Sequence, residues 1–285
     1  MQYNLFSQTA KYKLISLASG SNGNCYYLGT SEYGILIDAG IGMRTIKKYL
    51  REYGVAIETI IAVLVTHDHA DHIKSLGGLG NKMLIPVYAT ETVHSGIERN
   101  YCMPESLEPG SRRIIEKGKT FEIKDFQITA FDVPHDTIEN VGYQIKLGNE
   151  TIVLATDIGR ITDTLTHYAA TANHLIIESN YDEEMLENGR YPYVLKKRIA
   201  SGMGHLSNRL TGELLCSIYH DNLNEIWLCH LSHDNNHPEL AYKTIELALK
   251  GRGVKVGHDV ILKTLSRGKP SGLKEFNIAY SHSQL

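Results

Sequence analysis

The stretch Thr66-His67-Asp68-His69-Ala70-Asp71-His72 directly follows Ile60 to Val65, a run of apolar and mostly β-branched residues. Such a run is typical of a strand that is covered on both faces. On an extended chain end His67 and His69 project to the same side, and a following helical turn brings Asp71 and His72 toward a neighbouring point. So many ligand-type side chains in so short a stretch favour two adjacent metal ions over one. Imidazole and carboxylate ligands suit Zn²⁺, Mn²⁺ or Fe.

Ligand-type residues also stand where other apolar runs end. His135 follows the alternating stretch that leads to Phe131, Asp157 ends the run from Val153, and His230 ends the run from Trp227. In open α/β proteins the functional side chains gather at the carboxyl ends of the strands. Each residue alone would be read as an ordinary surface side chain, but together with the first cluster they complete two sets of ligands.

Composition limits the class of protein. The chain has 285 residues, is 42% hydrophobic and carries a formal net charge of −3, so a globally basic nucleic-acid binder is not indicated. The cysteines are scattered without a Cys-x-x-Cys pair, which argues against a disulfide scaffold and a thiolate zinc finger. The first residues lack an apolar signal core, and no run approaches the roughly 20 apolar residues of a membrane span. We therefore expect a cytoplasmic protein that does not enter a membrane.

Strand-like and helix-like segments alternate without a repeat or an obvious linker, which predicts one mixed α/β domain over residues 1–285. Helical spacing predicts helices at Ile41–Tyr53, Leu210–Tyr219 and from Pro238 to about Lys250. The polar stretch 270–285 is expected to be a loosely held tail.

The order of the candidate ligands resembles the motif set of the metallo-β-lactamase superfamily over nearly the whole chain. The resemblance implies an α/β fold, a four-layer αββα sandwich with the metals at one edge. It also implies a first metal held by His67, His69 and His135, a second held by Asp71, His72 and His230, and a bridge from Asp157. Asp38 matches the first motif of the superfamily, where it would orient ligands by hydrogen bonding.

Further segments resemble one branch of that superfamily, the YycJ/WalJ family, whose members are described as bacterial 5′→3′ DNA exonucleases. These segments are Ala18–Asn24, Glu178–Asp182, Gly204–Asn208 and His230–Ser232 with the asparagines that follow. Within them the candidates for substrate contact are Ser207, Asn208, Asn235 and Asn236. The interval from Asp157 to His230 is too short for the large inserted domain of the β-CASP nucleases.

His205 has three alternative roles. Its motif resembles the histidine that ribonuclease Z relatives place opposite the metals, where it protonates the leaving group. It could also be a residue of the loop that caps the next helix, for which Asn208 is a candidate N-cap. A third alternative makes His205 the last metal ligand in place of His230. We favour His230 as the ligand because it ends an apolar strand.

The expected reaction is two-metal hydrolysis of a phosphodiester. A water that bridges the metals would become the attacking hydroxide. Asp71 could accept a proton from this nucleophile, and His205 could protonate the departing oxygen. Two other functions fit the same residues: hydrolysis of a small substrate (a cyclic nucleotide, lactone, thioester or phospholipid), or a non-catalytic, metal-stabilised DNA-binding module. Because every expected ligand position is filled, a decayed site is disfavoured.

The expected substrate is a nucleic acid, with DNA favoured, and binding it requires positive charge near the site. Basic residues occur near the His205 motif and near the end of the chain: Arg190, Lys196, Lys197, Arg198 and Arg209, then Lys263, Arg267 and Lys269. Such clusters can follow phosphates, although solvated lysines are equally common. Tyr181, Tyr191 and Tyr193 could stack on bases, or could simply edge the core. The oligomeric state stays open.

Overall fold

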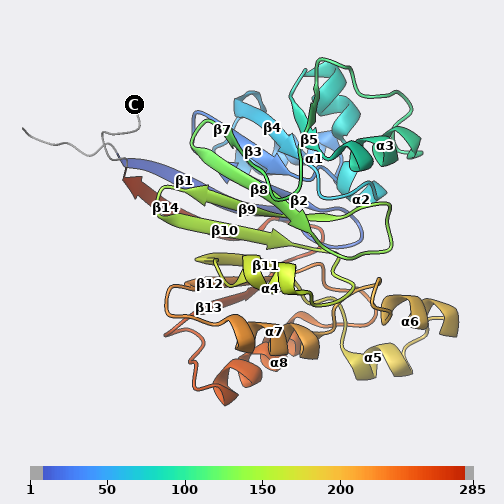
Figure 1. Ribbon diagram of the computed structural model, residues 1–285, viewed down its shortest axis with the longest axis vertical. Helices are drawn as coiled ribbons and strands as arrows, with labels where there is room; N and C mark the ends of the chain where they lie inside the picture. Colours follow the sequence, from blue (N-terminus) through green and yellow to red (C-terminus); the bar gives the residue numbers. More distant parts are fainter. Residues whose placement is uncertain (1–8, 280–285) are drawn as a thin grey trace, which may run out of the picture.

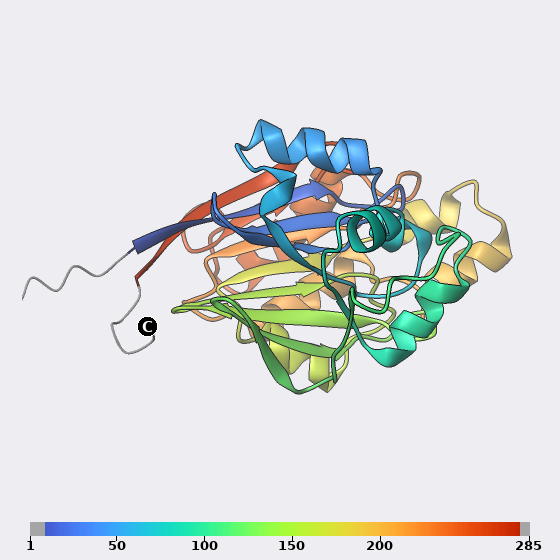
Figure 2. The same cartoon turned by 90° about the horizontal axis from the view of Figure 1, so that it is seen from above.

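The computed structural model describes residues 9–279 and consists of two sheets packed face to face between outer helices (Figures 1 and 2). Within those residues the first sheet has the order β14-β1-β2-β3-β4-β5-β6. Its strands are β1 Thr9–Ala18, β2 Cys25–Gly29, β3 Gly34–Ile37, β4 Ile60–Leu64, β5 Val87–Ala89, β6 Arg112–Ile114 and β14 Ser271–Ala279.

The second sheet has the order β13-β12-β11-β10-β9-β8-β7. Its strands are β7 Thr120–Ile123, β8 Phe126–Asp132, β9 Val141–Leu147, β10 Glu150–Ala155, β11 His174–Glu178, β12 Glu225–Cys229 and β13 Ile261–Thr264. In each sheet one half is parallel: β3 to β6 in the first and β10 to β13 in the second.

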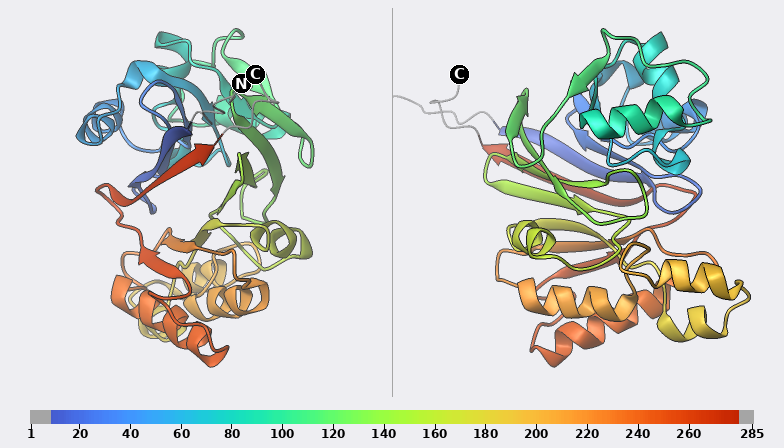
Figure 3. Two further views of the ribbon diagram at one scale, coloured as in Figure 1. Left: turned by 90° about the vertical axis from the view of Figure 1, so that its left-hand side faces the viewer. Right: turned by 45° about the vertical axis from the view of Figure 1, so that its right-hand side comes forward.

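Helices cover the outer face of each sheet (Figure 3). Over the first sheet lie α1 Met43–Glu52, α2 Ala70–Ile73 and α3 Glu91–Arg99, together with the 3₁₀ turn η1 Ile57–Thr59 and the π-helical turn η2 Gly77–Lys82. Over the second lie α4 Asp163–Ala169, α7 Asn208–Ile218 and α8 Pro238–Gly251. Two short helices, α5 Glu183–Asn188 and α6 Tyr193–Ile199, project beyond the layers. This is the expected αββα sandwich.

The strand periodicity of two explains the layers. Along β1, Leu14 packs in the cluster between the sheets, whereas the next residue, Ile15, packs in the cluster beneath the helices of the first sheet. The cluster between the sheets also holds Trp227 and Phe126, and a third cluster lies beneath α4, α7 and α8. Alternate residues thus enter different apolar layers.

The expectation of a loose tail over residues 270–285 is wrong for Ser271–Ala279, which forms β14. This strand pairs with β1 along most of its length, because the inward-facing Phe276 and Ile278 complete the cluster between the sheets. The rest of that expectation, residues 280–285, lies outside the described residues. Among residues 9–279, no helix combines the length and the apolar character needed to cross a bilayer.

The described ends of the chain should therefore be part of the folding unit. Phe276 is 9% exposed and stacks on Tyr12 and His174, at 6.3 and 5.3 Å between ring centroids. We expect Phe276→Ala to lower the free energy of unfolding by about 3 kcal/mol, the usual cost of emptying an aromatic core position. Leu273→Ala, on the same strand but 39% exposed, should cost under about 1 kcal/mol. Equal midpoints of urea unfolding for the two variants would contradict this assignment.

Candidate metal centre

The candidate ligands meet where strands of both sheets end, at the carboxyl side of their parallel halves. Asp38 follows β3, His67 to His72 follow β4, His135 follows β8, Asp157 follows β10, Glu178 ends β11 and His230 follows β12. The structure therefore brings together every residue that the sequence predicted as a ligand, and the chain turns into α2 directly after His69 as expected.

The backbone at this edge adopts an unusual conformation. Asp38, Asp157 and His230 have φ angles of 60°, 56° and 53°, in the left-handed region that residues other than glycine seldom enter. Each lies one or two residues beyond the end of its strand. Local strain of this kind collects at functional sites, where it aims side chains that a regular strand could not.

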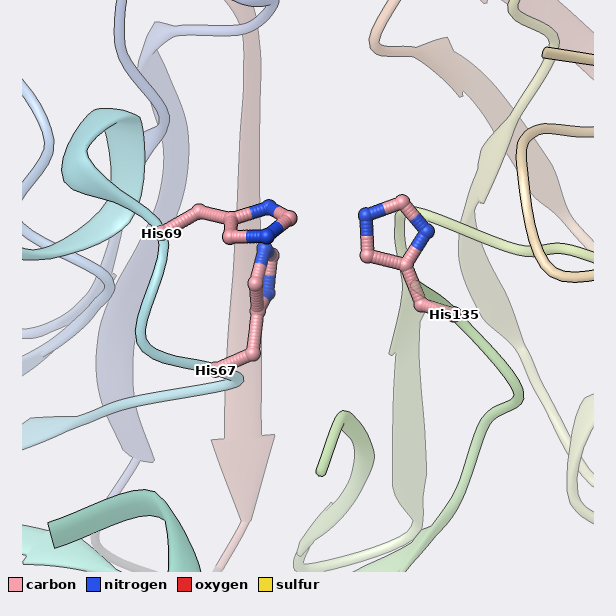
Figure 4. A group of neighbouring side chains, drawn as sticks. All are labelled: His67, His69 and His135. Atoms are coloured by element: carbon pink, nitrogen blue, oxygen red, sulfur yellow. The ribbon is translucent and has the colours of Figure 1, made fainter. Parts of the chain in front are cut away.

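The first set comprises His67, His69 and His135, whose rings converge from the two sheets (Figure 4). Their ring centroids lie 4.6 to 5.3 Å apart. His135 Nδ1 donates to the Gly204 carbonyl at 2.9 Å, which leaves its Nε2 free to act as a ligand. Burial holds the pKa of His67 well below its usual range and also lowers that of His135. Neutral imidazole is the form that binds metals.

The second set comprises Asp71, His72 and His230. Asp71 Oδ2 lies 3.6 Å from His72 Nε2 and 3.7 Å from His230 Nε2. Asp157 stands between the two sets, because its Oδ1 is 3.7 Å from His135 Nε2 and its Oδ2 is 3.3 Å from His72 Nε2. One carboxylate therefore faces both groups of nitrogens, which is the position a bridging ligand requires.

Unpartnered buried atoms indicate that the donor set fits divalent metal ions. His67 Nε2 and His230 Nε2 are buried and have no hydrogen-bond partner. A buried polar atom without a partner costs free energy, so both nitrogens call for a ligand. The donor atoms of each set lie within 4.8 Å of one another. Imidazole and carboxylate groups in this arrangement could hold two divalent ions.

Asp38 supports the second set from behind. It is fully buried; its Oδ2 accepts from His72 Nδ1 at 2.7 Å, and its Oδ1 accepts from the Thr66 backbone at 2.8 Å. Burial alone would lower the pKa of His72, but the carboxylates, Asp38 foremost, raise it well above its usual range. Conversely, the histidines, His230 foremost, hold the pKa of Asp157 well below its usual range although burial opposes this. Asp38 therefore lies where the sequence predicted, behind the ligands.

Glu178 is the main residue that the sequence analysis missed. It is fully buried, and its Oε1 accepts from both His205 Nδ1 at 2.8 Å and His230 Nδ1 at 3.0 Å. Its Oε2 accepts from the backbone N–H groups of Ile158 and Leu206 at 2.7 and 3.0 Å. One carboxylate thus fixes the ring orientation of two histidines. The signals in the sequence are an acidic residue at the end of an apolar strand and its place in Glu178–Asp182, one of the segments that resemble the YycJ/WalJ family.

Asn24 was also missed. Its Oδ1 accepts from the Gly20 backbone at 2.8 Å, which turns its amide nitrogen toward the second set. The nitrogen lies 2.9 Å from His72 Nε2 and 3.4 Å from Asp71 Oδ2. The turn-rich stretch before β2, which the sequence analysis noted for its family resemblance, thereby contacts the candidate centre.

His205 lies across from both sets. Its ring is 5.1 Å from that of His135 and 5.2 Å from that of His230. Its Nδ1 is engaged by Glu178, while its side chain keeps 21% of its surface exposed, so the other ring nitrogen is the one left for a substrate. Burial would lower the pKa of His205, but Glu178 raises it overall. His205 and His230 also form a group of potential ligand atoms with Asp157 and Glu178. That His230 is the ligand and His205 faces the substrate therefore stays a prediction.

The expected substrate contacts at the asparagines need correction. Ser207, Asn208, Asn235 and Asn236 are all buried, so a substrate cannot reach them. Asn208 and Asn236 exchange reciprocal amide hydrogen bonds at 3.0 Å, which join the start of α7 to the loop before α8. Ser207, not Asn208, is the N-cap of α7, where its Oγ accepts from the Leu210 backbone. These polar residues form hydrogen bonds inside the protein.

The basic residues divide into groups with different surroundings. Arg209 is paired with Glu183 and Glu213, and Lys263 with Glu225 at the opposite end of β12 from His230. Arg267 donates to the Ser232 carbonyl at 2.6 Å and lines a cavity of about 360 Å³ together with Lys269 and Leu231. These contacts account for much of the charge at Arg209 and Lys263 without a nucleic acid.

The three tyrosines also differ. Tyr181 is buried, and the hydroxyl of Tyr191 donates to Asp234 at 2.8 Å. Tyr193, on α6, is 68% exposed. Base stacking therefore stays a prediction for Tyr193 and is ruled out by burial for Tyr181.

Comparison with known proteins identifies similar chains. Residues 33–223 match the family model described as the Beta-lactamase superfamily domain. The chain is 36% identical over 241 residues to the Exodeoxyribonuclease YycJ of Bacillus anthracis, covering 85% of this chain and 90% of that one. It is 36% identical over 248 residues to the Exodeoxyribonuclease WalJ of Streptococcus pneumoniae serotype 2, covering 87% and 92%.

A solved structure shares the fold at lower identity. Zn²⁺-bound PqqB from Methylobacterium extorquens superposes with a TM-score of 0.67 and 17% identity, covering 91% of this chain and 99% of that one. At this identity the likeness concerns the fold alone.

The variant Asp38→Asn tests whether Asp38 supports the metal ligands. We expect it to lower metal affinity while the protein still folds. The amide is nearly isosteric, but it lacks the negative charge that faces His72 Nδ1. Loss of such a supporting carboxylate typically weakens metal affinity by about 10- to 100-fold. Titration against a chromophoric chelator measures this, with Asp259→Asn, which lies on a surface loop, as the matched control. Unchanged affinity in Asp38→Asn would show that Asp38 only supports the backbone.

Proposed function

Because the chain belongs to the metallo-β-lactamase superfamily and, within it, to the YycJ/WalJ family, we propose that it is a metal-dependent phosphodiesterase that degrades DNA from the 5′ end. The observation that carries the proposal is the pair of ligand sets that share Asp157. A paired centre is what in-line displacement at phosphorus uses.

In this proposal His67, His69 and His135 would hold one ion, and Asp71, His72 and His230 would hold the other. The Asp157 carboxylate, which faces both sets, would contribute to each. Zinc or manganese suits these donors, and iron is compatible. When bound, two such ions polarise the phosphoryl oxygens and lower the pKa of a coordinated water. Every other contribution comes from the side chains around them.

Asp71 and His205 are the residues that we propose to move protons. Asp71 reaches the centre with its carboxylate and is partly exposed, so it can accept a proton from the attacking water. His205 is held by Glu178 through Nδ1, so that its remaining nitrogen can donate to the departing oxygen. Glu178 also favours the protonated ring, which is the form that a proton donor needs. A DNA substrate would place this activity in the cytoplasm.

Removal of metal tests the function directly. We expect a chelator to abolish degradation of a 5′-phosphorylated duplex, and Mn²⁺ or Zn²⁺ to restore it. A label on the 5′ end should leave at once as a mononucleotide, while a label on the 3′ end should stay on a progressively shorter strand. Asp157→Ala, prepared in parallel, controls for contaminating nuclease. Chelator-resistant cleavage, or release that begins at the 3′ end, would count against the proposal.

The role of His205 can be tested with two leaving groups. His205→Ala should slow DNA cleavage by about 100-fold or more, the usual contribution of a positioned acid. Hydrolysis of bis(4-nitrophenyl) phosphate should change little, because nitrophenolate departs without protonation. Metal content, measured by mass spectrometry, should equal that of the wild type. Equal losses on both substrates, or a loss of metal, would instead make His205 a ligand or a structural residue.

A further inference from the structure

Helix α6 is unusual among the described helices because it has no buried residue. Tyr193 and Val194 are 68% and 78% exposed. In Figure 3 the segment with α5 and α6 extends past the layers of the sandwich, and Figure 1 shows it on the same side of the molecule as α2. Leu195, Lys196 and Ile199 are half-buried, whereas Tyr193, Val194 and Lys197 are exposed, so only the exposed side is open to a partner.

The last turn of α6 is fixed next to the candidate metal centre. Arg198 donates to Asp136, the neighbour of the ligand His135. The His205 backbone donates to the Ile199 carbonyl at 2.9 Å. A Cβ on Gly204 would lie only 2.2 Å from the carbonyl oxygens of Arg198 and Ile199, so the loop that carries His205 packs tightly on the helix. Whatever α6 binds is therefore held close to the reacting groups.

The basic side chains of α6 differ in their partners. Arg198 is paired with Asp136, and Lys196 donates to the Glu187 carbonyl at 2.6 Å. Lys197 instead lies 4.7 Å from the centre of the Tyr193 ring, one helical turn away. The exposed surface thus offers an aromatic ring with an ammonium group over one of its faces. This pair matches a nucleotide, since the ring can stack on a base and the ammonium group can contact the adjoining phosphate.

We propose that α6 is the surface that holds one strand of the DNA next to the metal centre, with Tyr193 stacking on a base and Lys197 contacting a backbone phosphate. This inference rests on the proposed nuclease function and deepens it. The occupant is a single strand, because the face of a base becomes accessible only once it leaves the duplex. The acidic helix α5 next to it would keep the strand on the α6 side.

The test uses single-residue variants of the full chain, assayed for KM and kcat on a single-stranded oligonucleotide. Tyr193→Ala should raise KM by roughly 10-fold, within the range for loss of one stacked base, and Tyr193→Phe should restore it. Lys197→Ala should raise KM at low salt and reduce the slope of log KM against log salt by about 0.7, the value for one phosphate contact. For each variant kcat on bis(4-nitrophenyl) phosphate should match the wild type.

The chain offers a matched control in Lys48 of α1, which lies 5.6 Å from the centre of the Tyr49 ring. Lys48→Ala also removes a lysine that lies over a tyrosine ring, although Lys48 is in addition 3.9 Å from Glu52, and it should leave KM and the salt slope unchanged. If the wild-type protein degrades DNA and the Tyr193 and Lys197 variants have the same KM as the wild type, the proposed role of α6 is wrong but the nuclease function stands. Hydrolysis of the aryl phosphodiester without any degradation of DNA would overturn the nuclease function, and the role of α6 with it.

Discussion

Asp38, Asp157 and Glu178 are carboxylates almost wholly removed from water, and the rest of the centre depends on how their charge is compensated. A buried carboxylate is tolerated only when donors or opposite charges surround it. Asp38 meets His72 and the Thr66 backbone, and Glu178 meets two histidines and two backbone N–H groups. Asp157 accepts from the Thr156 hydroxyl at 2.8 Å and otherwise depends on the histidine rings around it. The histidines therefore cannot be rearranged independently of the strand ends that deliver these acids.

Several ligands could be predicted because a titratable side chain stands one to three residues after a recognisable apolar strand. His67, Asp157 and His230 are of this kind, and the strands that precede them were predicted as well. Glu178 escaped notice because its role depends on the backbone of Ile158 and Leu206, which only the folded chain brings near. No local pattern carries that information.

The role of a polar residue is ambiguous in sequence, because the same side chain can contact a substrate or pair inside the protein. An asparagine near a catalytic motif looks the same in sequence whether it meets a substrate or, like Asn208 and Asn236, pairs with another amide inside the protein. The stretch from Ser271 also looked polar, because only its alternate residues, such as Phe276 and Ile278, face the core. Tertiary pairing with β1 gave this stretch its structure.

The pairing of β1 with β14 has a practical consequence. Thr9 lies opposite Ala279, so the described chain starts and stops on neighbouring strands. The other end of β1 leads into the turn where Ser19 accepts a hydrogen bond from the His230 backbone, at the metal centre. Both ends therefore point away from the reacting groups, as Figure 1 shows. Because Thr9 and Ala279 are paired, a chain that begins and ends at these two residues could be joined by a short linker, and circular permutation would then leave the metal centre undisturbed.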